Sequence, residues 1–214
     1  MKSLYTYIVE KSSDLYGSET GLIIFDIDDT LVKADSSIMK IYKNEPGKQE
    51  IALTTDEYAK DPDAGDPNKK SWFDYRDFND PLKVYDSIVK GTPLIKNLRI
   101  MDSYIKKGYD FCFLTARGCE DVVKSALDSF LEFRDKDGVL KKLGNVFKKS
   151  LSHAINDEMK NYSGNSDPEK KAQVLKNLCD KYDKVIFVDD DKKNVNAARK
   201  LNIKNLTVIK AWDE

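Results

Sequence analysis

Three carboxylates follow a short apolar run near the start of the chain. Residues 22–31 read LIIFDIDDTL, so Asp26, Asp28 and Asp29 come after residues that favour a buried strand. Ligand sites in open parallel sheets lie at the carboxyl ends of strands, and carboxylates this close together resist ionisation unless a cation is present. The segment therefore predicts a cation site at the end of a core strand. The alternative interpretation is a polar turn without a ligand.

Two later apolar runs also end in polar residues. The run at 111–114 is followed by Thr-Ala-Arg at 115–117, and the run at 184–188 is followed by three aspartates at 189–191. Because the carboxyl ends of parallel strands meet at one edge of a sheet, we expect all three polar segments to lie close together.

The expected donors at this edge are hard oxygen ligands. Asp26, Asp189 and Asp190 supply carboxylates, which suit Mg²⁺. The sequence contains no cluster of cysteine and histidine with the spacing of a zinc site. Magnesium is therefore the predicted metal.

Four segments, taken in order, resemble the four motifs of the haloacid dehalogenase (HAD) superfamily of aspartate-nucleophile phosphohydrolases. They are residues 26–31, residues 113–117, a lysine at the start of the helix expected at 170–182, and residues 187–191 with their paired aspartates. The resemblance covers residues 22–36 and 93–210, which is most of the chain. It implies a HAD-like core and a phosphatase activity.

The resemblance also implies a role for each acidic residue. Asp26 would attack phosphorus and form an aspartyl-phosphate. Asp28 would protonate the leaving oxygen and then deprotonate the incoming water. Mg²⁺ would be bound by Asp26, Asp189 and Asp190, together with the backbone carbonyl of Asp28.

The same resemblance implies how phosphate would be bound. The hydroxyl of Thr115 and the backbone amides that follow it, beginning with Ala116, would hold phosphate oxygens. A lysine would neutralise the aspartyl-phosphate, and Lys171 is preferred to Lys170, which points about 100° away on a helix. Arg117 has two open roles, a bidentate clamp on a substrate phosphate or a structural salt bridge.

Three further polar residues are expected to act within the protein. We expect Thr30 to support the loop after the first strand through backbone hydrogen bonds rather than to contact substrate. Asp191 should be solvated or cap the following helix. His153, the single histidine, has no evident catalytic partner and should be structural or exposed.

These residues must be positioned by alternating strands and helices. Helices are expected at 3–16, from Thr92-Pro93 to Gly108, and at 122–131, 170–182 and 195–201; strands are expected at 22–26, 111–114, 146–147, 184–188 and 206–209. This alternation predicts an α/β fold, a Rossmann-like three-layer parallel sheet with an insertion after the first strand.

The regular pattern is lost from about residue 33 to residue 91. We expect a single domain, residues 1–214, with a core formed by 20–36 and 92–214 and an insertion at about 37–91. The insertion is either a cap over the site or an elaborated loop, and 134–168 is a smaller candidate cap. An aromatic group at 72–78, which includes Trp72, would line a substrate cleft or form a small core of its own.

Composition limits the function classes. Charged residues make up 34% of the chain and hydrophobic residues 40%, with a formal net charge of -1, so no overall basic field indicates nucleic acid. No apolar stretch approaches the roughly 20 residues that span a bilayer. Three cysteines without ligand spacing favour reduced thiols, hence a cytoplasmic protein. No membrane and no obligate protein partner are predicted.

The substrate prediction rests on the resemblance. The fourth motif in its DDDKKN setting and the earlier Thr-Ala-Arg are similar to the phosphatase part of phage-type polynucleotide kinase-phosphatases, without a kinase P-loop. The favoured substrate is a nucleotide or nucleic-acid 3′-phosphate. A small-metabolite or acid phosphatase, a 5′-nucleotidase, and a binding module on an inactive HAD fold are the alternatives.

Overall fold

The computed structural model has a five-stranded parallel sheet at its centre, in the order β10-β7-β1-β11-β12. It describes residues 20–42, 50–64, 71–130, 132–134, 140–142, 151–157, 162, 164 and 166–211. The strands are β1 (Gly21–Phe25), β7 (Asp110–Thr115), β10 (His153–Ala154), β11 (Lys184–Asp189) and β12 (Leu206–Lys210). The chain passes from β1 to β7 on one side and later to β11 on the other. The order therefore reverses at β1, where such sheets bind ligands.

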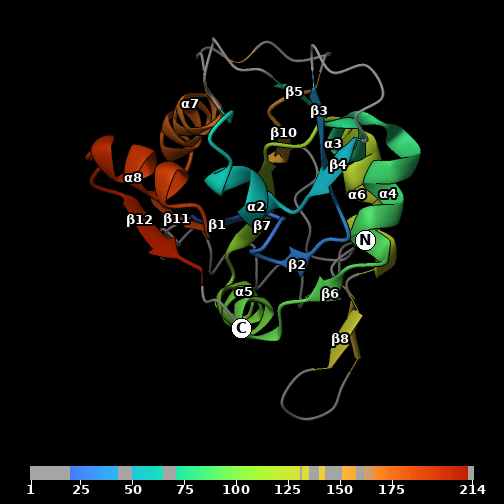
Figure 1. Ribbon diagram of the computed structural model, residues 1–214. Helices are drawn as coiled ribbons and strands as arrows, with labels where there is room; N and C mark the ends of the chain where they lie inside the picture. Colours follow the sequence, from blue (N-terminus) through green and yellow to red (C-terminus); the bar gives the residue numbers. More distant parts are fainter. Residues whose placement is uncertain are drawn as a thin grey trace, which may run out of the picture.

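Helices cover both faces of this sheet (Figure 1). They are α5 (Ile95–Ile105) and α6 (Glu120–Phe130) on one face, and α7 (Asp167–Cys179) and α8 (Lys192–Lys200) on the other. Side chains of β1 alternate between the two cores, since Ile23 and Phe25 pack on the first face and Leu22 and Ile24 on the second. The predicted α/β class with a parallel sheet is confirmed.

The segment after β1 folds as a small unit with its own sheet. The chain leaves and re-enters the core through β2 (Val32–Lys33) and β6 (Thr92–Pro93), which pair antiparallel. Between them, β3 (Ile38–Tyr42), β4 (Ile51–Leu53) and β5 (Ser71–Asp74) form an antiparallel sheet in the order β4-β3-β5, accompanied by α2 (Thr55–Lys60) and α3 (Arg76–Asn79). Of the two predicted forms of the insertion, this is more than an elaborated loop.

The last part of the predicted insertion belongs to the core. Helix α4 (Pro81–Val89) places Val84 and Ile88 in the same buried cluster as Val123 of α6. The prediction that regularity is lost up to residue 91 is therefore wrong for 81–89. The signal was present: Asp80 caps the helix, proline occupies its first position, and the buried residues are four apart.

The predicted start of α5 at Thr92-Pro93 is also wrong. These two residues pair with Val32 and Lys33, and the amide of Leu94 donates to the carbonyl of Leu31 (2.9 Å), so the helix begins only at Ile95. A tertiary strand pairing has overridden a good local capping sequence.

The remaining described elements are β8 (Glu132–Arg134) and β9 (Leu140–Lys142), which pair antiparallel. The expected helix at 3–16 and strand at 146–147 lie outside the described residues. Within the part of the chain that is described, no helix is both long and apolar enough to cross a membrane.

Candidate active site

The turn after β1 separates Asp26 from Asp28. The amide of Asp26 still donates to the carbonyl of Val188 on β11 (3.0 Å), so this residue continues the strand. The carbonyl of Ile27 then accepts from three following amides, and Asp29 has a φ of 53°, in the left-handed region. The chain turns so tightly that two carboxylates only two residues apart have different neighbours.

Three carboxylates from β1 and β11 converge beyond the sheet. One carboxylate oxygen from each of Asp26, Asp189 and Asp190 lies within 4.8 Å of the others. Asp26 and Asp189 are buried. The structure thus brings together the three residues that the sequence predicted to converge, and Asp28 is outside this group.

Lys171 lies between two of these carboxylates. Its Nζ is 2.9 Å from Oδ1 of Asp26 and 2.8 Å from Oδ2 of Asp189, and the residue is only 2% exposed. Lys170, by contrast, donates from Nζ to Oδ1 of Asn156 (2.8 Å). Of the two lysines that the third motif left open, Lys171 is the one that faces the site.

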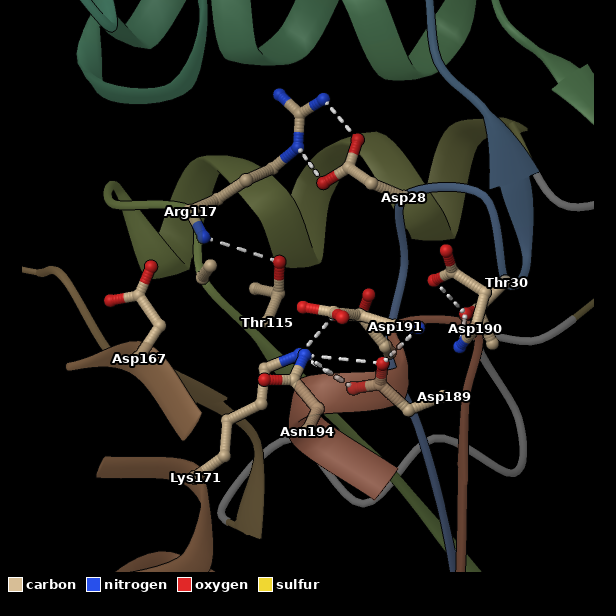
Figure 2. A network of polar contacts seen from close by, with 12 residues as sticks. Asp28, Thr30, Thr115, Arg117, Asp167, Lys171, Asp189, Asp190, Asp191 and Asn194 are labelled. Carbon is tan, nitrogen blue, oxygen red and sulfur yellow. Dashed lines mark hydrogen bonds and ion pairs between the residues drawn. The ribbon is translucent and has the colours of Figure 1, made fainter. Parts of the chain in front are cut away.

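Asp189 is held by three donors in addition to its backbone. Lys171 contacts Oδ2, the amide of Asp191 donates to Oδ1 (2.9 Å), and Nδ2 of Asn194 lies 3.1 and 3.0 Å from the two oxygens. Figure 2 shows Asn194 and Lys171 directed at Asp189 from different helices. The sequence analysis did not identify Asn194, although its place in the first turn of α8, directly after β11, was a usable signal.

Thr30 connects the first and fourth motifs. Its hydroxyl donates to Oδ1 of Asp190 (3.0 Å) and accepts from the amide of Asp190 (3.1 Å). The amide of Thr30 donates to the carbonyl of Ile27 (3.3 Å), a backbone bond of the predicted kind, whereas its hydroxyl is bonded to a residue 160 positions away in the sequence. Asp191 caps α8 by accepting from the amide of Lys193 (2.8 Å), one of its two predicted roles.

The electrostatics of the cluster show an excess of negative charge. Burial raises the pKa of Asp26 well above its usual range, opposed by Lys171, with Asp189 and Asp190 raising it further. Burial likewise raises the pKa of Asp190 to about 7, with the charge of Asp189 adding to it. Burial lowers the pKa of Lys171, but Asp189 and Asp26 together raise it more. One ammonium group does not neutralise three carboxylates, two of which are buried.

Thr115, the last residue of β7, and Arg117, two residues later, lie beside this cluster (Figure 2). The amide of Arg117 donates to Oγ1 of Thr115 (3.2 Å), and both residues are buried. A hydroxyl that accepts this bond still has its own O–H to donate. Because the amides of Arg117 and Gly118 are bonded within the protein, Ala116 is the amide of this loop that remains a candidate for phosphate.

Arg117 forms the salt bridge rather than the phosphate clamp. Its Nε donates to Oδ2 of Asp28 (2.9 Å) and its Nη2 to Oδ1 (2.6 Å), as Figure 2 shows. The residue is 0% exposed. A guanidinium that is buried and already bound bidentately to a carboxylate is not available to a substrate phosphate, so the expectation that Arg117 binds substrate is corrected.

The aromatic residues of the insertion divide between a core and a surface. Phe73 is buried and packs edge-on against Tyr58, whereas Trp72, its neighbour on the other face of β5, is 44% exposed. Tyr75 is 37% exposed and its hydroxyl lies 2.7 Å from that of Tyr58. Burial and this hydrogen bond raise the pKa of Tyr75, and the carboxylate of Asp167 raises it further.

The end of the insertion that carries Tyr75 adjoins the loop after β7. Tyr75 directly precedes α3, whose Phe78 carbonyl accepts from the amide of Gly118 in that loop (3.0 Å). The Nδ2 of Asn156 donates both to the carbonyl of Ala116 (2.7 Å) and to Oδ1 of Asp167 (3.1 Å), so Asp167 lies beside the same loop. His153 is placed elsewhere, with Nδ1 2.7 Å from the hydroxyl of Tyr162, a structural contact.

A comparison with models of known protein families gives no match, and a comparison with curated proteins gives no significant similarity.

Proposed function

We propose that this protein is a Mg²⁺-dependent phosphomonoester hydrolase of the HAD type. The observation that carries the proposal is the buried Lys171, which lies between Asp26 and Asp189 with Asp190 beside them. One lysine among three carboxylates, placed where the strand order of a parallel sheet reverses, suits the binding of a divalent cation together with a phosphate.

The donor set fits a hard divalent cation. All three converging groups are carboxylates, and the raised pKa values of Asp26 and Asp190 indicate that positive charge is lacking. The side-chain oxygen of Asn194 is also buried and has no hydrogen-bond partner among the described residues. Asp26, Asp189 and Asp190 would hold the ion, with the carbonyl of Asp28 as a further ligand by resemblance. Bound there, Mg²⁺ supplies charge that offsets the repulsion between carboxylate and phosphate.

The chain's own residues would then carry out the separate steps of the reaction. The Asp26 carboxylate attacks phosphorus, and the bond from phosphorus to the leaving oxygen breaks as Asp28 supplies that oxygen with a proton. Water next attacks the phosphorus of the aspartyl-phosphate while Asp28 takes its proton, and the bond from phosphorus to the Asp26 oxygen breaks, which restores the carboxylate and releases inorganic phosphate. Lys171 remains beside the nucleophile through both steps and offsets its negative charge, while the Thr115 hydroxyl and the Ala116 amide donate to phosphate oxygens.

The proposed substrate class is a nucleotide or nucleic-acid 3′-phosphate. With Arg117 committed to Asp28, this part of the proposal rests on Tyr75, which is partly exposed, fixed by Tyr58 and at the end of the insertion that adjoins the loop after β7. A tyrosine ring so placed can stack on a base, which contributes roughly 1–3 kcal/mol. We also propose a cytoplasmic location, in keeping with three cysteines that form no disulfide.

The experiment that tests the activity is the Asp26→Asn variant assayed with p-nitrophenyl phosphate. We expect turnover to fall at least about 10³-fold because the amide is a poor nucleophile, while circular dichroism stays unchanged. Asp191→Asn, an exposed cap on α8, is the matched control and should retain activity. EDTA should abolish turnover and added Mg²⁺ restore it. A wild-type protein inactive with Mg²⁺ on a panel of phosphomonoesters would indicate a binding module instead.

A further inference from the structure

The loop after β7 is bound to the insertion at three consecutive residues. The backbone carbonyls of residues 77–79, at the end of α3, accept hydrogen bonds from the side chain of Arg117 (3.2 Å), the amide of Gly118 (3.0 Å) and Sγ of Cys119 (3.0 Å). A Cβ on Gly118 would lie 3.1 Å from Oδ1 of Asn79, so the contact is close. The insertion and the second-motif loop are thus fixed to each other residue by residue.

The guanidinium of Arg117 is the centre of this contact. Two of its nitrogens hold the Asp28 carboxylate, Nη2 also donates to Oγ of Ser36 (2.6 Å), and Nη1 donates to Oγ of Ser87 (3.0 Å). The ring of Phe78 lies 4.9 Å from the guanidinium carbon. Phe78 belongs to the insertion, Ser36 to the segment that leads into it between β2 and β3, and Ser87 to α4. The direction of the guanidinium is therefore set from outside the sheet.

This arrangement makes the position of Asp28 depend on Arg117. A planar guanidinium fixes a carboxylate in both distance and direction when it binds bidentately. The side chain of Arg117 is fully buried, and that of Asp28 is 19% exposed, so water does not easily replace either partner. Asp28 is the more exposed of the two partners, so in the proposed function a proton can be exchanged there with a ligand.

We propose that Arg117 is a positioning residue for Asp28, and that the insertion acts on the chemistry through it. The inference rests on the proposed function, in which Asp28 is the general acid and base. As Asp26 bonds to phosphorus, the leaving oxygen takes the electron pair of the broken bond and the proton of Asp28. Loosening of the guanidinium misdirects that proton without moving the nucleophile.

Leaving groups distinguish this role from a purely structural one. A p-nitrophenolate departs with little protonation, whereas the alkoxide of a nucleoside 3′-phosphate needs the proton. A variant that only misdirects Asp28 should therefore lose far more turnover on the alkyl ester than on the aryl ester. A variant that distorts the whole site should lose both equally.

The test uses Arg117→Lys, Ser36→Ala and Ser87→Ala in the full chain with Mg²⁺. Arg99→Lys, at an exposed arginine, is the control for the first variant. Ser103→Ala controls for Ser87→Ala, because both hydroxyls donate to the carbonyl three residues earlier in a helix but only Ser87 contacts Arg117. kcat and KM are measured on p-nitrophenyl phosphate and a nucleoside 3′-phosphate, with melting temperature as the check on folding.

We expect Arg117→Lys to lower kcat on the nucleoside 3′-phosphate at least about tenfold more than on p-nitrophenyl phosphate, with KM little changed. The serine variants should show the same trend to a smaller extent, and the controls none. Equal losses on both substrates, or no loss, in folded variants would overturn the proposal. If Arg117→Lys does not fold, the two serine variants decide. A wild-type protein that hydrolyses neither ester would overturn the proposed function, and this role with it.

Discussion

At the scale of the residue, the division between Asp26 and Asp28 is produced by one tight turn. The carbonyl of Ile27 accepts three following amides, and the turn directs Asp26 to Lys171 and Asp28 to Arg117. Each carboxylate thus receives one buried cation. Their different environments are what a nucleophile and a proton-transfer group require.

Lys171 provides the first prediction at this scale. Lys171→Met should remove turnover and lower the free energy of unfolding at neutral pH by about 3–5 kcal/mol, because it leaves two buried carboxylates without their cation. Lys170→Met, which among the described residues loses a hydrogen bond to Asn156, is the matched control and should change each quantity far less. Activity and urea unfolding measure both. Greater damage from Lys170→Met would show that the third motif is assigned one residue out of register.

Asp190 provides the second prediction, which concerns pH. Its pKa is raised in the folded protein to about 7, above the ordinary value near 4, so folding favours its protonated form. Without metal, this contribution to stability should be lost as pH rises from about 4 to 7. Bound Mg²⁺ favours the ionised form, so the rise in melting temperature on adding Mg²⁺ should be larger at pH 8 than at pH 5.5.

Two asparagine variants at neighbouring aspartates, one as the test and one as the control, check this prediction. Asp190→Asn should flatten the fall in melting temperature of the metal-free protein between these pH values. Asp191→Asn, whose side chain caps α8, should leave it as in the wild type. A melting temperature of the metal-free wild type that rises steadily from pH 5 to pH 8 would contradict the direction given for Asp190.

At the scale of the element, the insertion is stabilised by its own buried charge network. Lys40 on β3 lies 2.7 Å from Asp61 and 3.1 Å from Asp63, and the hydroxyl of Ser71 on β5 donates to Asp63. In addition, the hydroxyl of Thr55 on α2 donates to Oδ2 of Asp29 (2.9 Å). This hydrogen bond joins the insertion to the turn after β1.

The third prediction follows from that network. Lys40→Met should raise amide hydrogen exchange in β3 and β5 on the order of tenfold, because two carboxylates lose their cation, while exchange in β1 and β11 stays unchanged. The exposed pair of Lys90 with Asp86 is the control, and Lys90→Met should have little effect anywhere. Faster exchange throughout the central sheet would show that the insertion and the core unfold as one unit.

At the scale of the whole molecule, the insertion and the core share one site. The insertion contributes contacts to Arg117 and Asp29, and Tyr75 directly precedes α3, whose Asp77 carbonyl accepts from Arg117. A leaving group bound at the cluster would therefore meet both parts of the chain. In the proposed function, this arrangement would let the insertion influence both the chemistry and the choice of substrate.

The fourth prediction concerns that choice. Tyr75→Ala should lower kcat/KM for a nucleoside 3′-phosphate by about one decade relative to p-nitrophenyl phosphate, because a stacking partner of the base is lost. Trp72→Ala is the matched control: this residue is also exposed, but it lies on the face of β5 opposite Phe73 and Tyr58. In a wider screen, a sugar phosphate that outperforms every nucleotide would refute the nucleic-acid substrate and leave only the phosphatase.

The sequence by itself determined the parallel α/β sheet and the meeting of Asp26, Asp189 and Asp190, because apolar periodicity and the rule for strand ends are local signals. It did not determine α4 as part of the core, although Asp80, Pro81 and Ile88 carried a signal. Contacts between distant segments decided the rest. The partner of Arg117 lies 89 residues away, and the pairing of β6 with β2 displaced the start of α5. A charged side chain or a capping sequence limits which kinds of group can bind to it. Which of these groups becomes the partner is decided only when the chain folds.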